Sequence, residues 1–120
     1  MNQIRCHYDG PLMHFAELLA SRLGTSVDFR DYENEWEWVW VHYADGFIDI
    51  SRNHDDMQGG FQNPIGIFLA RADREVFLDW APDDARHVAK QIDGAADLVA
   101  VVDGEEVVLM KLTSDGKPGA

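Results

Sequence analysis

The sequence predicts an α+β domain: a mostly antiparallel sheet with two helices on one face, in the order β-α-β-β-β-β-α-β-β. Two segments have the apolar spacing of helices, and several strand-like segments are joined in pairs by turn residues. The chain has 120 residues and is 46% hydrophobic, which suits one core. We therefore expect a single domain over residues 1–112, followed by a flexible C-terminal tail at residues 113–120.

The first predicted elements are a strand at residues 4–8 and a helix that begins after Pro11. Proline suits the first position of a helix, and Gly24 stands where a helix commonly ends in a left-handed conformation. The apolar residues between them fall on one helical stripe: Leu12, Phe15, Ala16, Leu19 and Leu23.

A polar connection follows, and two strand-like runs, residues 35–43 and 47–52, then flank the hairpin signal Ala44-Asp45-Gly46. Residues 53–64 are rich in Gly, Asn and Asp and predict a loop. Residues 65–71 and 75–80 predict a second pair of strands.

The second helix is predicted after Pro82, with Asp83 and Asp84 in the first turn, where carboxylates interact favourably with the helix dipole. Gly94 is the expected end of this helix. The last hairpin, residues 98–102 and 107–112, turns on Asp103-Gly104.

Three tryptophans, Trp36, Trp38 and Trp40, occupy alternate positions of the first hairpin, so its register decides which face they join. A two-residue turn at Asp45-Gly46 places them beside His42, Asp49 and Ser51 on a binding surface. A three-residue loop pairs Trp40 with Ile50 and places the indoles in the core. We favour the three-residue loop, because it separates polar from apolar residues more cleanly. The contact surface would then be the opposite face, with Glu35, Glu37, Tyr43 and Asp49.

The net charge is −12, from 22 acidic and 10 basic side chains. Nucleic acids and anionic membranes are bound through cationic contacts, so we expect neither as a partner. A macromolecular partner is expected to be a basic protein. The N-terminus has no apolar leader, and the single Cys6 cannot form an internal disulfide, which predicts a cytoplasmic protein.

Two groups of residues could carry chemistry. His54, Asp55 and Asp56 in the central loop could bind a metal or act as acid and base, which would make the protein a small hydrolase or metal-dependent enzyme. Cys6, with His7, Asp9 and His14, could form a nucleophilic site. Neither group has a spacing that requires such a site, so we expect a protein that is not an enzyme, with no cofactor and no metal.

Acidic and large aromatic residues alternate in "DFRDYENEWEWVWVHY", residues 28–43, and the "SRNHDDMQGG" loop follows. In these features the chain resembles the immunity proteins of bacterial toxin systems, whose members bind and block a cognate toxin domain. The resemblance implies a small inhibitor that neutralises a cognate protein, which the net charge predicts to be basic. The chain is expected to be a monomer or a homodimer. A small-ligand or homodimerisation domain is the remaining alternative. The expected partner-binding residues are Asp31, Glu33, Glu35, Glu37, Tyr43, Asp49, His54, Asp55 and Asp56.

Overall fold

The computed structural model describes residues 3–33, 36–53, 63–73, 76–92, 97–102 and 105–111; for residues 29, 32 and 33 and for the last two ranges it describes the backbone alone. The elements in chain order are β1 (Gln3–Cys6), α1 (Leu12–Arg22), β2 (Val27–Glu33), β3 (Trp36–Tyr43), β4 (Gly46–Asn53), β5 (Ile65–Ala70), β6 (Phe77–Leu78), α2 (Pro82–Lys90), β7 (Asp97–Val102) and β8 (Glu105–Lys111). The α+β prediction is confirmed, with one strand, β2, added to the predicted order.

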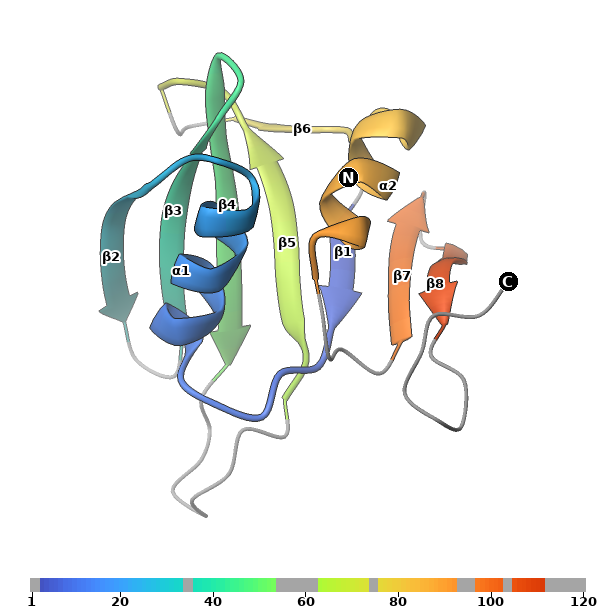
Figure 1. Ribbon diagram of the computed structural model, residues 1–120, viewed down its shortest axis with the longest axis horizontal. Coiled ribbons are helices and arrows are strands. Elements are labelled where there is room, and N and C mark those ends of the chain that lie inside the picture. Colours follow the sequence, from blue (N-terminus) through green and yellow to red (C-terminus); the bar gives the residue numbers. More distant parts are fainter. Residues whose placement is uncertain are drawn as a thin grey trace.

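The strands form one eight-stranded sheet in the order β2-β3-β4-β5-β1-β7-β8, with β6 paired to the end of β5. Every pairing between the described strands is antiparallel. Both helices lie on the same face of the sheet (Figure 1). Helix α1 packs on β2, β3 and β4, and α2 lies toward β8. The opposite face of the described sheet carries no helix, and we call it the open face.

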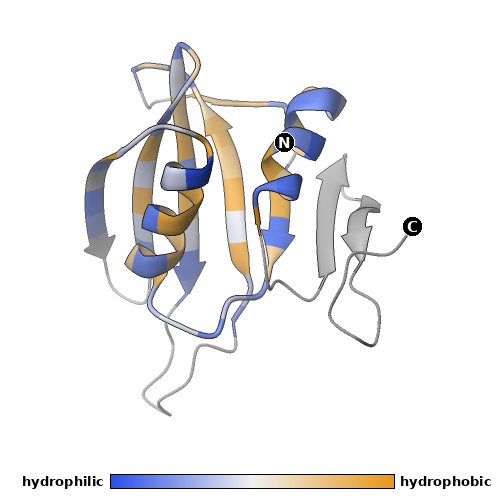
Figure 2. Cartoon of the chain, in the orientation of Figure 1, coloured by the Kyte–Doolittle hydropathy of each residue, from blue (hydrophilic) through white to orange (hydrophobic). Residues whose placement is uncertain are grey.

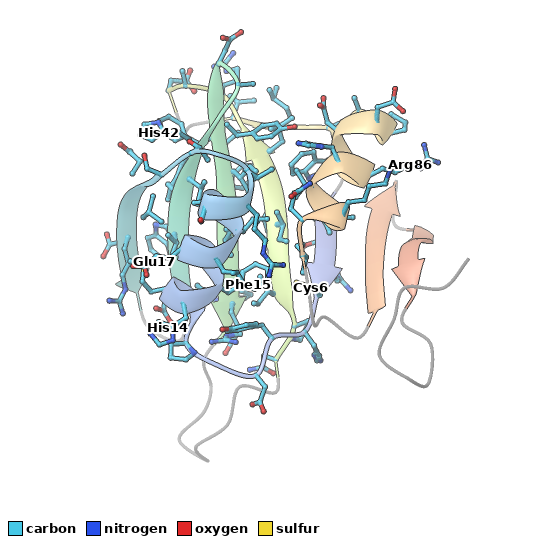
Figure 3. The ribbon with its side chains drawn as sticks, in the orientation of Figure 1. Cys6, His14, Phe15, Glu17, His42 and Arg86 are labelled. Atoms are coloured by element: carbon cyan, nitrogen blue, oxygen red, sulfur yellow. The ribbon has the colours of Figure 1, made fainter. Side chains whose placement is uncertain are left out.

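Helix α1 begins and ends where the sequence predicts. Pro11 precedes its first residue, and Gly24 has a φ of +73° just beyond its end. The amides of Gly24 and Thr25 donate to the carbonyls of Ser21 and Ala20, the paired bonds of a Schellman motif. Phe15 is buried and points to the sheet side of α1, whereas His14 and Glu17 point away from it (Figure 3).

Helix α2 also follows its predicted start, with Pro82 in its first turn together with Asp83 and Asp84. Its buried residues are Ala85, Val88 and Ala89. The rest of its surface is hydrophilic, which matches a helix that covers the core on one side only (Figure 2).

The main core lies between the helices and the sheet. It is built from alternate residues of the central strands, including Val39, Val41, Ile48 and Ile50, together with the apolar faces of α1 and α2. Arg52 is a charged residue buried in this layer, only 1% exposed, and its guanidinium donates to the carbonyls of Tyr8 at 3.0 Å and Gly10 at 2.6 Å. Arg52 therefore fixes the connection between β1 and α1.

Strand β2 occupies the segment that we expected to be a polar connection. It pairs with β3 from Trp36 to Val41, with an irregularity between Val27 and Phe29, and it forms one edge of the sheet. Its sequence, VDFRDYE, is rich in charge, a composition that protects exposed strand edges against further pairing. The strand was missed because these charges are typical of connections as well as of edge strands.

The hairpin register differs from both expectations. Tyr43 pairs with Gly46, so the two-residue turn is Ala44-Asp45, and Trp40 lies opposite Asp49. The favoured three-residue loop, with the indoles in the main core, is wrong. Val39 and Val41 pair with Ile50 and Ile48 beneath the helices, and the tryptophans belong to the open face. The side chains are therefore divided between the two faces as in the alternative with a two-residue turn. The turn itself lies one residue earlier than in that alternative, at Ala44-Asp45 instead of Asp45-Gly46.

Gly46 explains the error. We expected it to be a turn residue, but the positive φ in this turn belongs to Ala44, at 50°. Gly46 is instead the first residue of β4, where an added Cβ would overlap the carbonyl oxygen of Ala70 on β5. This glycine therefore serves the close approach of two strands rather than the turn.

The other predicted segments agree broadly with the structure. The predicted strand at 75–80 is reduced to the two residues of β6, and both strands of the last hairpin are present as β7 and β8. Gly94, Asp103-Gly104 and the predicted tail at 113–120 lie outside the described residues. None of the described helices is long and apolar enough to cross a membrane.

Candidate functional site

The open face carries the tryptophans. Because side chains alternate along a strand and Val39 and Val41 point to the helices, Trp36, Trp38, Trp40 and His42 follow one another on the open face of β3. We call these four residues the aromatic row. Exposure falls along the three tryptophans and rises again at His42: Trp36 is 51% exposed, Trp38 is half-buried, Trp40 is 8% exposed and His42 is exposed.

A small second cluster supports the aromatic row. Trp40 packs edge-to-face on Phe47, with ring centroids 5.8 Å apart, and Ala70 and Trp38 join them. His42 lies 5.0 Å from the Phe47 ring. These contacts hold the inner part of the row in place, while Trp36 remains largely exposed to solvent.

Asp49 is buried within this face. Its neighbours across the strands are Trp40 on β3 and Phe68 on β5, and it is only 5% exposed. The hydroxyl of Ser51 donates to its carboxylate. Burial raises the pKa of Asp49 to about 6, although the hydrogen bond from Ser51 acts in the opposite direction. A buried carboxylate with a shifted pKa is typical of functional sites, although structural networks also contain such groups.

Next to Asp49, the open face contains a hollow of about 400 Å³. Its described lining residues come from four strands, β1, β3, β4 and β5, and from the segment just before β5: Gln3, Arg5, Trp36, Ser51, Pro64, Gly66 and Phe68. Arg5, Gly66 and Ser51 are direct neighbours across β1, β5 and β4 and form its floor. Trp36 and Phe68 supply aromatic surface around that floor.

Gly66 allows the residues around the hollow to approach its floor. A Cβ at this position would lie 2.9 Å from the Phe68 ring and 3.0 Å from the Gln3 side-chain amide. The Gln3 amide, turned so that its oxygen faces Arg5, accepts from Arg5 Nη2 at 3.0 Å and from Nε at 3.2 Å. The guanidinium is therefore held in a defined orientation at the side of the hollow.

Acidic residues lie along the β2 edge of the open face. The ring of His42 lies 3.1 Å from Asp28, measured from Nε2 to Oδ1. Asp31 is exposed and pairs in register with Trp38. The exposed end of the aromatic row is thus next to a strand that bears carboxylates.

The residues of the predicted contact surface do not lie on one face of the sheet, contrary to our expectation. Glu37 and Tyr43 lie on the helix side of β3, whereas Asp49 lies on the open face. Glu37 pairs with Arg30 at 3.2 Å, and Asp49 is buried rather than exposed. The backbone of Glu33 belongs to β2, and its side chain lies outside the described residues, as do Glu35, His54, Asp55 and Asp56. A role of these residues in partner binding stays a prediction.

Tyr43 belongs to a second hollow, at the turn end of the hairpin. Its hydroxyl donates to Asp84 of α2 at 3.1 Å, and its ring packs on Trp80. Burial, followed by the hydrogen bond and the charge of Asp84, raises the pKa of Tyr43. This hollow also has a volume of about 400 Å³, and Leu69, Arg71 and Leu78 contribute to its walls. The Tyr43–Asp84 bond ties the hairpin to α2.

The candidate nucleophile does not have the surroundings that such chemistry needs. Cys6 is buried on the helix side, and burial raises the pKa of its thiol to about 12 despite the nearby charge of Arg52. A thiol that stays protonated is a poor nucleophile. His7, Asp9 and His14 are exposed. In the part of the chain that the structure describes, no group of three or more His, Cys, Asp or Glu side chains could hold a metal ion.

Gln3, Arg5, Gly66 and Phe68, which line the hollow, were not among the residues expected from the sequence. The sequence of β5 contained a signal for this site, because Gly66, Phe68 and Ala70 alternate there with isoleucine and leucine. A glycine inside a strand marks a close approach to the backbone.

Comparisons of the chain with models of protein families, with curated proteins and with solved structures found no match.

Proposed function

We propose that the protein is a non-catalytic inhibitor of the immunity type, which binds a basic protein partner through the open face of its sheet. The observation that carries the proposal is the aromatic row on a face that no described helix covers. Its outermost member, Trp36, is 51% exposed on a regular strand. The proposed contact surface therefore lies on the tryptophan side of the hairpin, and not on the helix side as expected from the sequence.

Aromatic side chains support this role because they dominate the affinity of many protein interfaces. Beyond the aromatic row, the open face presents Phe68 and Phe77, whose rings stack with centroids 5.1 Å apart. Phe77 is 40% exposed. A partner that covered Trp36 and this pair would bury aromatic surface, and the stacked Phe68 and Phe77 rings would lose little side-chain entropy on binding because their packing already restricts them.

Charge supports a basic partner. The chain carries a net charge of −12, and Asp28 and Asp31 stand on the strand that borders the aromatic row. Complementary charge increases the rate of association and orients the partners, whereas buried aromatic contacts slow dissociation. The proposed partner therefore has a basic surface with an apolar recess for Trp36.

The test compares two exposed apolar residues on opposite faces. Wild-type protein, Trp36→Ala and Leu78→Ala are used to capture proteins from the cells that express the chain. Leu78 is 38% exposed but pairs with Leu69, which packs on the main core, so it serves as the matched control. The captured protein is then purified, and its binding is measured by surface plasmon resonance at several salt concentrations.

We expect Trp36→Ala to weaken binding by about tenfold or more, as for an interface anchor, and Leu78→Ala to leave it within about twofold. The association rate of the wild type should fall as salt rises. Equal binding by all three proteins, or an association rate that does not depend on salt, would overturn the proposal. Sedimentation at two protein concentrations tests the homodimer alternative. If the wild type is a dimer and Trp36→Ala is a monomer, the open face binds a second copy of the chain and not a basic partner.

A further inference from the structure

We propose that the second hollow, at the turn end of the β3–β4 hairpin, is a binding site for a small primary amine with a compact apolar body. This hollow lies on the helix side of the sheet, because Tyr43 and Leu69, which line it, pack against the main core. The proposed interaction with a protein partner uses the open face and assigns no role to this site. The inference therefore goes beyond the proposed function and is tested without any partner.

Several parts of the chain meet around the second hollow. Its described lining residues belong to the hairpin turn, the end of β5, β6 and the first turn of α2, and β6 runs across the end of β5 toward the start of α2 (Figure 1). The 3.1 Å hydrogen bond from the Tyr43 hydroxyl to Asp84 joins the hairpin to α2 and so holds two of these parts together. The volume of about 400 Å³ lies within the range of small-molecule sites.

The walls of the second hollow favour an apolar body. The Tyr43 ring is held by its edge-to-face contact with Trp80, with ring centroids 6.0 Å apart. Leu69, Leu78 and Ala72 supply aliphatic surface beside it. Leu69 is half-buried and Leu78 is 38% exposed, so an apolar ligand would remove from water a surface that water now contacts.

The charges around the second hollow favour a cation. Asp45 and Asp84 are the carboxylates among its described lining residues, and Arg71 is the cation among them. Arg71 Nη2 lies 2.5 Å from Oδ2 of Asp73, so its charge is already paired with a carboxylate. The surroundings of the hollow are therefore negative, as is the chain as a whole, and they suit an ammonium group better than an anion.

Asp84 and Tyr43 together offer acceptors for an ammonium group. The Tyr43 hydroxyl donates to Oδ1 of Asp84, and both the carboxylate and the hydroxyl oxygen keep acceptor capacity after this bond is made. A primary ammonium has three donors and can meet both groups, whereas a neutral alcohol has one donor and a quaternary ammonium has none. The preference for a primary amine rests on this pair.

The chain offers a matched control for Asp84. Asp83 precedes it in the first turn of α2, its side chain is fully exposed, and it is not among the residues that line the second hollow. Replacing either residue by Asn removes one negative charge from the same end of the helix, and Asn at position 84 keeps an oxygen for Tyr43. A difference between the two variants therefore reports the direct contact with the ligand rather than the general attraction of an acidic protein for cations.

The experiment compares 2-phenylethylamine, a cation at pH 7.5, with three related probes. These are 2-phenylethanol as the neutral form, 3-phenylpropionate as the anion, and ethylamine as the ammonium group without the ring. Binding to the full chain is followed by the backbone amide resonances in two-dimensional NMR at pH 7.5. We expect 2-phenylethylamine to shift the resonances of Gly46, Leu69 and Asp84, and to bind about fivefold more tightly than each of the other probes.

Asp84→Asn should reduce the affinity for 2-phenylethylamine by about fivefold, and the matched control Asp83→Asn should leave it within about twofold. Thermal melting of both variants establishes that they are folded. The probe series on the wild type needs no variant, so it decides the question even if Asp84→Asn does not fold. Equal affinity for the amine and the alcohol, an equal loss in the two variants, shifts confined to another surface, or the absence of shifts at millimolar probe would each overturn the inference.

Discussion

At the scale of single residues, Asp49 is the most unusual feature of the molecule. A carboxylate that is only 5% exposed, with Trp40 and Phe68 as its cross-strand neighbours, is desolvated more than its single hydrogen bond from Ser51 can offset. A leucine or valine would be a more stabilising neighbour for these rings. Such a residue is expected where function outweighs stability, and Asp49 lies directly behind the floor of the hollow.

The raised pKa of Asp49 determines how stability depends on pH. Burial raises the pKa of Asp49 from its ordinary value of 3.8 to about 6 in the folded protein, so the folded state holds the proton more tightly between about pH 4 and pH 6. The free energy of unfolding therefore falls as the pH rises through this window, by about 3 kcal/mol from this group at most. Asp49→Asn removes the charge and keeps an acceptor for Ser51.

We expect Asp49→Asn to be more stable than the wild type at pH 7.5 and the difference to be mostly lost near pH 4, where Asp49 is protonated in the folded state and about half protonated in the unfolded state. Urea unfolding at the two pH values measures the difference. Asp45→Asn, which replaces an exposed carboxylate in the hairpin turn, is the control and should change stability little. A stabilisation by Asp49→Asn that is equal at both pH values would show that charge burial is not its cause.

At the scale of elements, local sequence signals predicted where helices and hairpins lie, but not how β3 and β4 pair. Pro11, Gly24 and Pro82 act within one helical turn, so their effect can be read from neighbouring residues. The hairpin register depends on Gly46, whose role is set by Ala70, a residue of a strand that comes later in the chain. A one-residue error there exchanges the two faces, and this is why the tryptophans were assigned to the wrong side.

The two roles of glycine in this fold can be compared by mutation. Gly24→Ala meets no neighbouring atom and only has to adopt a positive φ, which costs about 1 kcal/mol. Gly46→Ala places a methyl group against the Ala70 carbonyl, and β4 and β5 must separate to admit it. We expect it to lower the free energy of unfolding by about 2 kcal/mol or more. Chemical denaturation of both variants gives the order, and a larger loss for Gly24→Ala would contradict this account of the hairpin.

At the scale of the whole molecule, length and composition predicted a single domain and the order of helix-like and strand-like segments predicted the α+β class, and the structure agrees. The candidate site was much less accessible to sequence reasoning. Arg5, Ser51 and Gly66 meet because three strands, far apart in the sequence, are neighbours in the sheet. No local pattern records the order β4-β5-β1, so such a site becomes visible only once the strand order is known.

The net charge of −12 is also a property of the whole chain, and it affects stability as well as binding. Like charges repel more strongly in the compact folded state than in the unfolded chain. Surface ion pairs such as Arg30–Glu37 offset this repulsion only slightly, since exposed pairs contribute less than about 1 kcal/mol each. Added salt should therefore screen more repulsion than attraction, and the free energy of unfolding should rise.

We expect the melting temperature at pH 7.5 to rise by about 5 °C when sodium chloride increases from about 0.01 M to about 0.3 M, because the Debye length contracts over this range. The control is the same titration near pH 4.5, which equals the isoelectric point calculated from the sequence. Net repulsion is absent there, so the rise should vanish. A rise of the same size at both pH values would assign the stabilisation to a salt effect other than screening, and a fall at pH 7.5 would mean that attractive ion pairs outweigh the net charge.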